Sequence, residues 1–230
     1  MDEIDWSELA EVYDHFNSTK YNVVLPMFCT WVVERLDERG LSDPERMVEV
    51  GCGTGLISEM LANWYPKTDF LLNDRHPAMV RFSRRRLESL GERVSMEEAD
   101  GLDFLRGLAD GSADVVLFSR SLYVLGNHES VAAEVMRVLS PDGLVFILDF
   151  LSAVDLSPLD EHFSSLEPEK WPLVRPVYED FNDGIAEGRY RLHSKESLLS
   201  LWRGVGGKPV TYQTNMPHSN THFMCTAKPE

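Results

Sequence analysis

The most informative stretch of the chain is Met47-Val48-Glu49-Val50-Gly51-Cys52-Gly53-Thr54-Gly55. Its first residues predict a short buried strand, and the apolar side chains that recur at helical spacing over residues 56–64 predict a helix directly after it. Glycine at alternate positions lets the backbone turn sharply and leaves no Cβ between the chain and a ligand. The first N–H groups of the helix have no partner within it and favour an electron-rich group. The stretch therefore predicts a site for a nucleotide-type cofactor.

The spacing of the glycines indicates which cofactor this turn holds. A dinucleotide fingerprint would place glycine at positions 51, 53 and 56, but position 56 is leucine and the third glycine is Gly55. The pattern E-x-G-x-G-x-G instead resembles motif I of the class I S-adenosylmethionine (SAM)-dependent methyltransferases, in which the glycine turn lies against the methionine part of the cofactor. An ordinary glycine-rich turn is the structural alternative. The resemblance makes SAM the expected cofactor, and its candidate binding residues here are Glu49, Gly51, Cys52, Gly53 and Gly55.

Further features of this family follow at the ends of the next predicted strands. The apolar run 69–73 ends in Asp74, and an acidic residue about 20 positions beyond a glycine turn binds ribose hydroxyls in nucleotide-binding folds generally. The resemblance implies that Met79 packs on the adenine and that Asp100 accepts a hydrogen bond from its amino group. Each residue alone also fits a structural role, such as a helix cap for Asp74. The candidates added in this way are Tyr21, Asp74, Arg75, Met79, Asp100, Gly101, Ser119 and Arg120.

The order of the elements predicts the fold class. Five strands are expected, near residues 47–50, 69–73, 93–98, 114–119 and 143–150. The helical patterns between them imply right-handed crossovers and a parallel sheet. Two more runs, 210–214 and 221–227, predict a hairpin across Pro217-His218-Ser219-Asn220 and resemble the family's last two strands. We therefore predict a single α/β domain over residues 1–230, a three-layer doubly wound and mostly parallel seven-stranded sheet with an antiparallel last strand.

Two segments lie outside this shared core and are expected to carry substrate choice. Residues 1–40 contain two helical patterns and resemble the N-terminal helical cap that covers the cofactor in the family. Residues 151–192 follow the fifth strand as an irregular insertion rich in proline, acidic and aromatic residues, and we interpret them as a substrate lid. Packing against the core is the alternative for both. The candidate substrate-binding residues are Tyr13, Tyr123, His162, Trp171 and Tyr178.

The implied chemistry is displacement at the sulfonium methyl by a substrate oxygen, nitrogen or carbon. Alignment of the reacting atoms and exclusion of water can supply most of the rate, so a general base is not required. If a hydroxyl is the nucleophile, the candidate catalytic residues are His128 after the fourth strand and Asp149 at the end of the fifth, and His162 in the insertion is a further candidate to accept the proton. A magnesium site would need paired acidic ligands after these two strands. Only Asp149 stands there, so no metal is predicted.

Composition limits the partners. The 230 residues carry a net charge of −16, which argues against a nucleic-acid partner because such binding depends on lysine and arginine. Three scattered cysteines indicate neither a disulfide framework nor a zinc site. No apolar run reaches the ~20 residues of a membrane span, and the acidic start lacks the layout of a secretion signal. We expect a cytoplasmic monomer or homodimer without a membrane partner.

These observations favour methyl transfer from SAM to an O, N or C atom of a small, partly hydrophobic molecule. Ser119-Arg120-Ser121-Leu122 stands where many nitrogen methyltransferases of this fold carry an Asn/Asp-Pro-Pro-Tyr motif, which makes methylation of a base or a glutamine amide less expected. One alternative is a SAM-binding cyclase or pericyclase that transfers no methyl group, since fold alone does not determine function. The other is a protein or tRNA methyltransferase.

Overall fold

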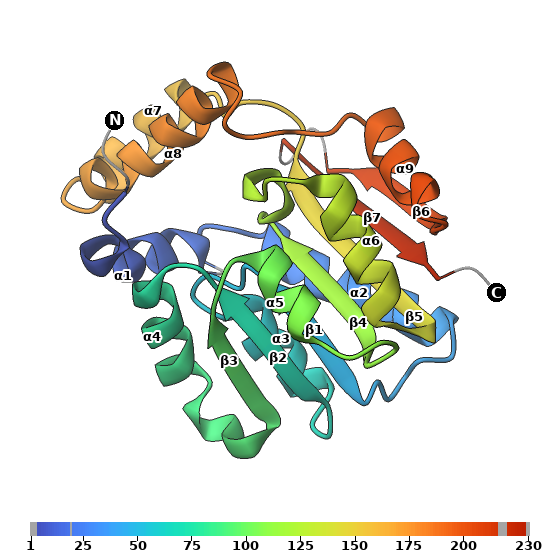
Figure 1. The fold of residues 1–230 in the computed structure, drawn as a ribbon. Helices are drawn as coiled ribbons and strands as arrows, with labels where there is room; N and C mark the ends of the chain where they lie inside the picture. The colour runs from blue at the N-terminus through green and yellow to red at the C-terminus, as the bar shows by residue number, and fades with distance from the viewer. Residues whose placement is uncertain (1–3, 19, 216–219, 229–230) are drawn as a thin grey trace.

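The computed structural model describes residues 4–18, 20–215 and 220–228, and its centre is one seven-stranded sheet (Figure 1). The strands stand in the order β3-β2-β1-β4-β5-β7-β6. Their bounds are β1 Arg46–Val50, β2 Asp69–Asp74, β3 Val94–Glu98, β4 Ala113–Ser119, β5 Leu139–Phe150, β6 Lys208–Thr214 and β7 Thr221–Ala227. β7 pairs antiparallel with both β5 and β6, whereas β1 to β5 pair in parallel. The predicted fold class and the antiparallel last strand are confirmed.

Helices cover both faces of the sheet and make three layers (Figure 1). Successive residues of β1 point to opposite faces, so Met47 packs into the core shared with α2 and α3 while Val48 packs into the core shared with α5, α6 and α9. Both faces are buried, which explains why these strands are almost continuously apolar. The helices of the layers are α2 Val24–Glu38, α3 Leu56–Trp64, α4 Pro77–Arg86, α5 Gly101–Gly107, α6 His128–Val138 and α9 Lys195–Gly204, with the 3-10 turns η1 Glu88–Arg93 and η2 Leu122–Val124.

Three further helices gather beyond the carboxyl ends of the strands: α1 Trp6–Asn17, α7 Ser157–Leu166 and α8 Trp171–Ala186. An aromatic cluster joins them, in which Phe16 of α1 packs on Phe163 of α7 and on Trp171 of α8 with ring centroids 4.9 and 5.8 Å apart. The four aromatic and aliphatic side chains at its centre are buried. A hydrogen bond between His15 of α1 and Glu167 just after α7, at 3.1 Å, joins the same segments. These contacts fix α1 to a part of the chain that lies far from it in sequence.

The structure differs from the sequence prediction at three places. The insertion after β5 is not irregular but forms α7 and α8, because proline at the first turn of each helix favours a helix start. β5 begins at Leu139 rather than near 143, since Leu139 already pairs with Ala113 and a register shift takes up the extra residues. Of the predicted cap, α2 packs in the layer against the sheet and only α1 lies over the strand ends. Residues 217–219 of the predicted hairpin turn lie outside the described residues.

Among the described residues, no helix combines the length and the apolar character needed to cross a membrane.

Candidate active site

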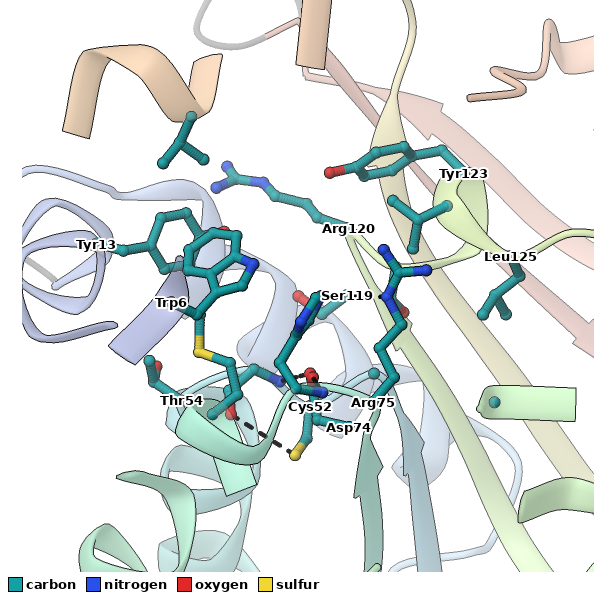
Figure 2. Close-up of a pocket in the computed structure, with 18 of the residues that line it drawn as sticks. Trp6, Tyr13, Cys52, Thr54, Asp74, Arg75, Ser119, Arg120, Tyr123 and Leu125 are labelled. Atoms are coloured by element: carbon teal, nitrogen blue, oxygen red, sulfur yellow. Dashed lines mark hydrogen bonds between the residues drawn. The ribbon is translucent and has the colours of Figure 1, made fainter. Parts of the chain in front are cut away.

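A cavity of about 650 Å³ lies at the carboxyl ends of the central strands, between the glycine turn and the helices α1 and α8 (Figure 2). This volume is typical of small-molecule sites, and open α/β sheets bind ligands at this edge. The predicted site residues that line the cavity are Tyr13, Glu49, Gly51, Cys52, Gly53, Asp74, Arg75, Met79, Asp100, Gly101, Ser119, Arg120 and Tyr123. The fold therefore brings most of the predicted cofactor residues around one space.

The three glycines of the turn all have left-handed backbone, with φ of +69° at Gly51, +54° at Gly53 and +77° at Gly55. A Cβ added at Gly51 would lie 2.7 Å from the Cβ of Ser121, and one added at Gly55 would lie 2.3 Å from the Oγ of Ser83. A Cβ at Gly53 would meet no protein atom within 4 Å. The outer two glycines are thus required by packing, while Gly53 leaves room on the cavity side for a ligand to lie against the backbone.

The end of β2 is tied to this turn by two side chains. The Asn73 side chain accepts a hydrogen bond from the Gly51 N–H at 3.2 Å and donates one to a backbone carbonyl at 2.9 Å. Asp74 accepts from the N–H groups of Gly53 and His76, both at 2.9 Å. Burial raises the pKa of Asp74, and these two hydrogen bonds act in the opposite direction. A carboxylate has about four acceptor positions, so Asp74 keeps capacity for further hydroxyl donors from the cavity.

Glu49 lies beneath the glycine turn with a side chain that is 1% exposed. Its carboxyl group accepts a hydrogen bond from the Ser58 hydroxyl. Burial raises the pKa of Glu49 to about 8, so the group is protonated at neutral pH. A neutral carboxyl group is a hydrogen-bond donor as well as an acceptor, which suits it to a polar group lying on the turn.

The far end of the cofactor region is formed by residues that follow β3. Asp100 caps α5 by accepting from the Leu102 N–H at 2.9 Å, and it also borders the cavity. A Cβ on Gly101 would lie 2.8 Å from Val50, so this glycine lets α5 approach the sheet closely. Met79 of α4 borders the same region with a side chain that is only 3% exposed. This end of the cavity therefore offers both a hydrogen-bond acceptor and an apolar surface.

These residues fit the groups of a SAM molecule. The open backbone at Gly53 can take the methionine part, the unused acceptor positions of Asp74 can take ribose hydroxyls, and the Asp100 end can take the adenine. In the part of the chain that the structure describes, no group of three or more His, Cys, Asp or Glu side chains is arranged to hold a metal ion.

The wall opposite the glycine turn is aromatic and belongs to α8, η2 and the segment after α8. Tyr123 packs on Phe181 at 5.0 Å and on Tyr190 at 5.3 Å between ring centroids. Phe181 also packs on Phe150 at the end of β5, at 4.5 Å. Two charged groups of this wall, Asp180 and Arg189, form an ion pair at 3.0 Å. Such a wall suits a partly hydrophobic ligand.

Asp149 does not border the cavity. Its carboxyl group is buried and accepts from the N–H groups of Tyr123 at 3.1 Å and Phe150 at 2.9 Å. Burial raises the pKa of Asp149 to about 7, against the effect of these hydrogen bonds and of the Arg120 charge. In this structure Asp149 therefore positions the backbone that carries the aromatic wall.

His128 also lies away from the cavity, fully buried at the start of α6. Its Nδ1 is 2.7 Å from Nε2 of His193, whose Nδ1 is 3.0 Å from the Ser197 hydroxyl. Burial lowers the pKa of both histidines, that of His193 to about 4, so the pair is neutral near pH 7. The pair connects the starts of α6 and α9.

Gly55 packs against Ser83 and does not border the cavity, and the other four predicted residues lie in or beside the aromatic cluster. Tyr21 packs on Phe16 at 5.8 Å, and its hydroxyl donates to Glu167. Trp171 is buried, and its ring nitrogen donates to a carboxylate 2.8 Å away. His162 packs on a neighbouring phenylalanine, and Tyr178 packs on Trp171. None of these four side chains borders the cavity in this structure.

The cavity also contains residues that were not among the predicted site residues, although Phe181 and Tyr190 belong to the aromatic insertion interpreted as a lid. They include Trp6, Asn17, Thr54, Asn73, Leu125, Asp180, Phe181, Arg189 and Tyr190. Thr54 and Asn73 are adjacent to predicted residues, so their positions in the motifs could have indicated them. Nothing local marks Asp180 or Arg189, because they reach the cavity only through the packing of α8 over the strand ends.

The sheet order, the glycine turn at the end of β1 and the acidic end of β2 define a Rossmann-like protein that binds a nucleoside cofactor at its strand ends. Residues 48–147 match the Methyltransferase domain family. This matched region, which holds the glycine turn and the ends of β2, β3 and β4, is similar to the class I SAM-dependent methyltransferase domains, whose methyl donor is S-adenosyl-L-methionine.

Several curated proteins are similar in sequence. A demethylmenaquinone methyltransferase of Thermus thermophilus is 28% identical over 145 residues, which are 63% of this chain and 64% of that protein. A trans-aconitate 2-methyltransferase of Pseudomonas paraeruginosa is 30% identical over 56% of this chain and 44% of its own length. A malonyl-[acyl-carrier protein] O-methyltransferase of Geobacter sulfurreducens is 34% identical over 49% and 44%. The chain thus spans less than two thirds of the length of each of these relatives.

Solved structures share the fold at lower identity. A SAM-dependent methyltransferase from Aquifex aeolicus has a TM-score of 0.63 and 14% identity, with 97% of this chain and 98% of that chain covered. The [4+2]-cyclase SpnF has a TM-score of 0.60 and 16% identity, with 86% and 80% covered. At these identities the likeness shows the fold alone.

Proposed function

We propose that the protein transfers the methyl group of SAM to a small, partly hydrophobic molecule. The observation that carries this proposal is that one cavity reaches from Gly53 and Asp74 to the aromatic wall at Tyr123 and Phe181. A cofactor held at the first end and an acceptor held at the second would share one space. Three relatives named for the methylation of demethylmenaquinone, trans-aconitate and malonyl-[acyl-carrier protein] agree with an acceptor that is not a nucleic acid.

The contribution of the chain to the reaction is binding, orientation and exclusion of water. When bound, SAM supplies a methyl group on a positively charged sulfur, which departs with the electron pair of the broken bond. Gly53 and Asp74 would fix the cofactor, while the rings of Tyr123 and Phe181 would hold the acceptor and cover the reacting atoms. The proposal includes no general base, since neither His128 nor Asp149 borders the cavity.

The test begins with binding and continues with turnover. Calorimetric titration with SAM and with S-adenosylhomocysteine should give saturable binding, and failure of both at millimolar concentration would refute the proposal. A panel of small molecules is then incubated with SAM and the protein. Release of S-adenosylhomocysteine together with a product heavier by one methyl group would support methyl transfer. Conversion of a molecule without S-adenosylhomocysteine release would instead indicate a cyclase, the activity named for one structure of the same fold.

A further inference from the structure

The Arg120 guanidinium stands in the cavity without a carboxylate partner. It makes no ion pair with Asp or Glu among the residues that the structure describes, and its Nε is buried without a hydrogen-bond partner. Its one side-chain hydrogen bond runs from Nη1 to the amide oxygen of Asn17 at 3.0 Å. By contrast, Arg189 of the same cavity is paired with Asp180 at 3.0 Å and Glu187 at 2.7 Å. Since a guanidinium matches a carboxylate with two parallel hydrogen bonds, Arg120 has unused capacity for such a group.

The backbone of Arg120 is held in a conformation that favours glycine. Its φ is +55°, and no other non-glycine residue among those described has a positive φ. The strand end keeps this conformation through a hydrogen bond from the Arg120 N–H to the Leu148 carbonyl at 2.7 Å. Glycine would adopt the same backbone without strain. Strained non-glycine residues cluster at functional sites, where the side chain is needed.

Two tyrosines, Tyr13 and Tyr123, line the cavity together with Arg120. Figure 2 shows the Tyr123 hydroxyl and the Arg120 guanidinium facing the same space, with the Tyr13 ring beside it. Burial raises the pKa of both tyrosines, and the charge of Arg120 acts against this rise. Because their hydroxyls stay protonated at neutral pH, both can donate hydrogen bonds to an anion held by Arg120.

The position of Arg120 assigns it to the acceptor end of the cavity. Its side chain extends away from Cys52 and Asp74, toward α1 (Figure 2). It lies over the Phe150 ring at 5.1 Å and bonds to Asn17 at the end of α1. These neighbours belong to the aromatic side and not to the glycine turn.

We propose that Arg120, with the hydroxyls of Tyr13 and Tyr123, binds a carboxylate group of the methyl acceptor, so that the substrate is a small, partly hydrophobic carboxylic acid. This inference rests on the proposed function. The net charge of −16 does not oppose it, because charges farther than about 8 Å are largely screened at physiological ionic strength. The other possible source of a carboxylate is the methionine part of SAM, and the experiment separates the two.

The first arm measures binding to the protein saturated with S-adenosylhomocysteine. The probes are cinnamate, octanoate and trans-aconitate, each compared with its uncharged amide. At least one acid should bind at least about 10-fold more tightly than its amide. Arg120→Gln should lower the affinity for that acid by about 10- to 100-fold, the usual effect of losing a charged pair. Arg106→Gln is the matched control, because Arg106 is an exposed arginine paired within α5 and should leave the preference unchanged.

The second arm measures the cofactor. Arg120→Gln should leave the affinities for S-adenosylhomocysteine and for 5′-methylthioadenosine, which lacks the amino-acid part, unchanged. Weaker binding of the first with normal binding of the second would mean that Arg120 holds the cofactor carboxylate, and would overturn the inference. Equal affinity for acids and amides, or no binding of any acid at millimolar concentration, would also overturn it while cofactor binding stands. If the unaltered protein binds neither SAM nor S-adenosylhomocysteine, the proposed function itself is refuted.

A second variant keeps the test valid if Arg120→Gln does not fold. Arg120→Gly removes the same side chain and relieves the left-handed backbone, so it should unfold at a temperature at least as high as the unaltered protein. It should lose the preference for acids in the same way. Arg120→Lys keeps the charge without the planar fork and should retain part of the preference. A full preference in Arg120→Gly would refute the assignment.

Discussion

Replacing Gly53 by alanine tests whether the glycine turn is the cofactor cradle. The added methyl group would meet no protein atom within 4 Å, so the folded chain loses nothing to a clash. Its φ of +54° is nevertheless unfavourable for any residue with a Cβ, at a cost of about 1–2 kcal/mol. The variant should therefore fold, with a free energy of unfolding lowered by about that amount.

The larger effect is expected on binding, because Gly53 lines the cavity and the methyl group would occupy space that the ligand needs. Forcing an extra methyl group into a well-packed contact costs about 1–3 kcal/mol. This corresponds to an affinity for S-adenosylhomocysteine that is lower by roughly 5- to 150-fold. Calorimetric titration measures the affinity, and urea unfolding of the same samples measures the stability.

Gly40→Ala provides the control for a positive-φ glycine outside the site. Gly40 has a φ of +73°, and a Cβ there would also meet no atom within 4 Å, but it lies outside the cavity lining. Both variants should lose stability, and only Gly53→Ala should lose affinity. Unchanged affinity in Gly53→Ala, or an equal loss of affinity in Gly40→Ala, would refute the assignment of the cradle.

Three further predictions concern single side chains. Asp74→Ala should weaken the binding of S-adenosylhomocysteine by about 1–3 kcal/mol in calorimetry, because charged hydrogen bonds are lost. Full affinity would contradict the role of Asp74 in binding the ribose hydroxyls. Burial raises the pKa of Asp149 from 3.8 to about 7, so only the folded state holds this proton between those values, and stability is lost as pH rises from the first value through the second. Asp149→Asn should therefore gain stability relative to the unaltered protein as pH rises from about 4 to about 7 in urea unfolding, and a constant difference would disprove the shift. Trp171→Ala should cost about 3–5 kcal/mol of stability, because the ring is 2% exposed. Since Trp171 anchors α8, which carries Phe181 of the cavity wall, the variant should also raise the KM for the acceptor while S-adenosylhomocysteine binds normally.

The cofactor end of the site could be predicted because its signals are local. The glycine turn, Asp74 and Asp100 each follow directly on a buried strand, and the carboxyl ends of parallel strands meet at one edge of a sheet. The strand order alone is therefore enough to predict that these residues lie close together. The same reasoning placed Ser119 and Arg120 at the cavity, since they end β4.

The acceptor end could not be predicted in this way. Tyr178 and Phe181 stand three positions apart on α8, yet only Phe181 borders the cavity while Tyr178 faces the aromatic cluster. Which side of α8 meets the cavity depends on its packing against α1, a contact between segments far apart in the chain. For the same reason Asp149, at the end of β5, turned toward the backbone of Tyr123 instead of the cavity.

This difference between the two ends has a consequence for how the protein can change its substrate. Gly53 and Asp74 are joined by a hydrogen bond and packed into the sheet, so alterations there affect both stability and the cofactor. The acceptor wall is carried largely by α8, which meets α1 through an aromatic cluster that contains none of the glycine-turn residues. Substitutions on the cavity side of α8 can therefore alter the acceptor while the cofactor end keeps its geometry. Arg120 connects the two ends, because its backbone follows directly on a core strand while its side chain bonds to Asn17 of α1. Its positive charge therefore stays in the cavity when residues of α8 are replaced.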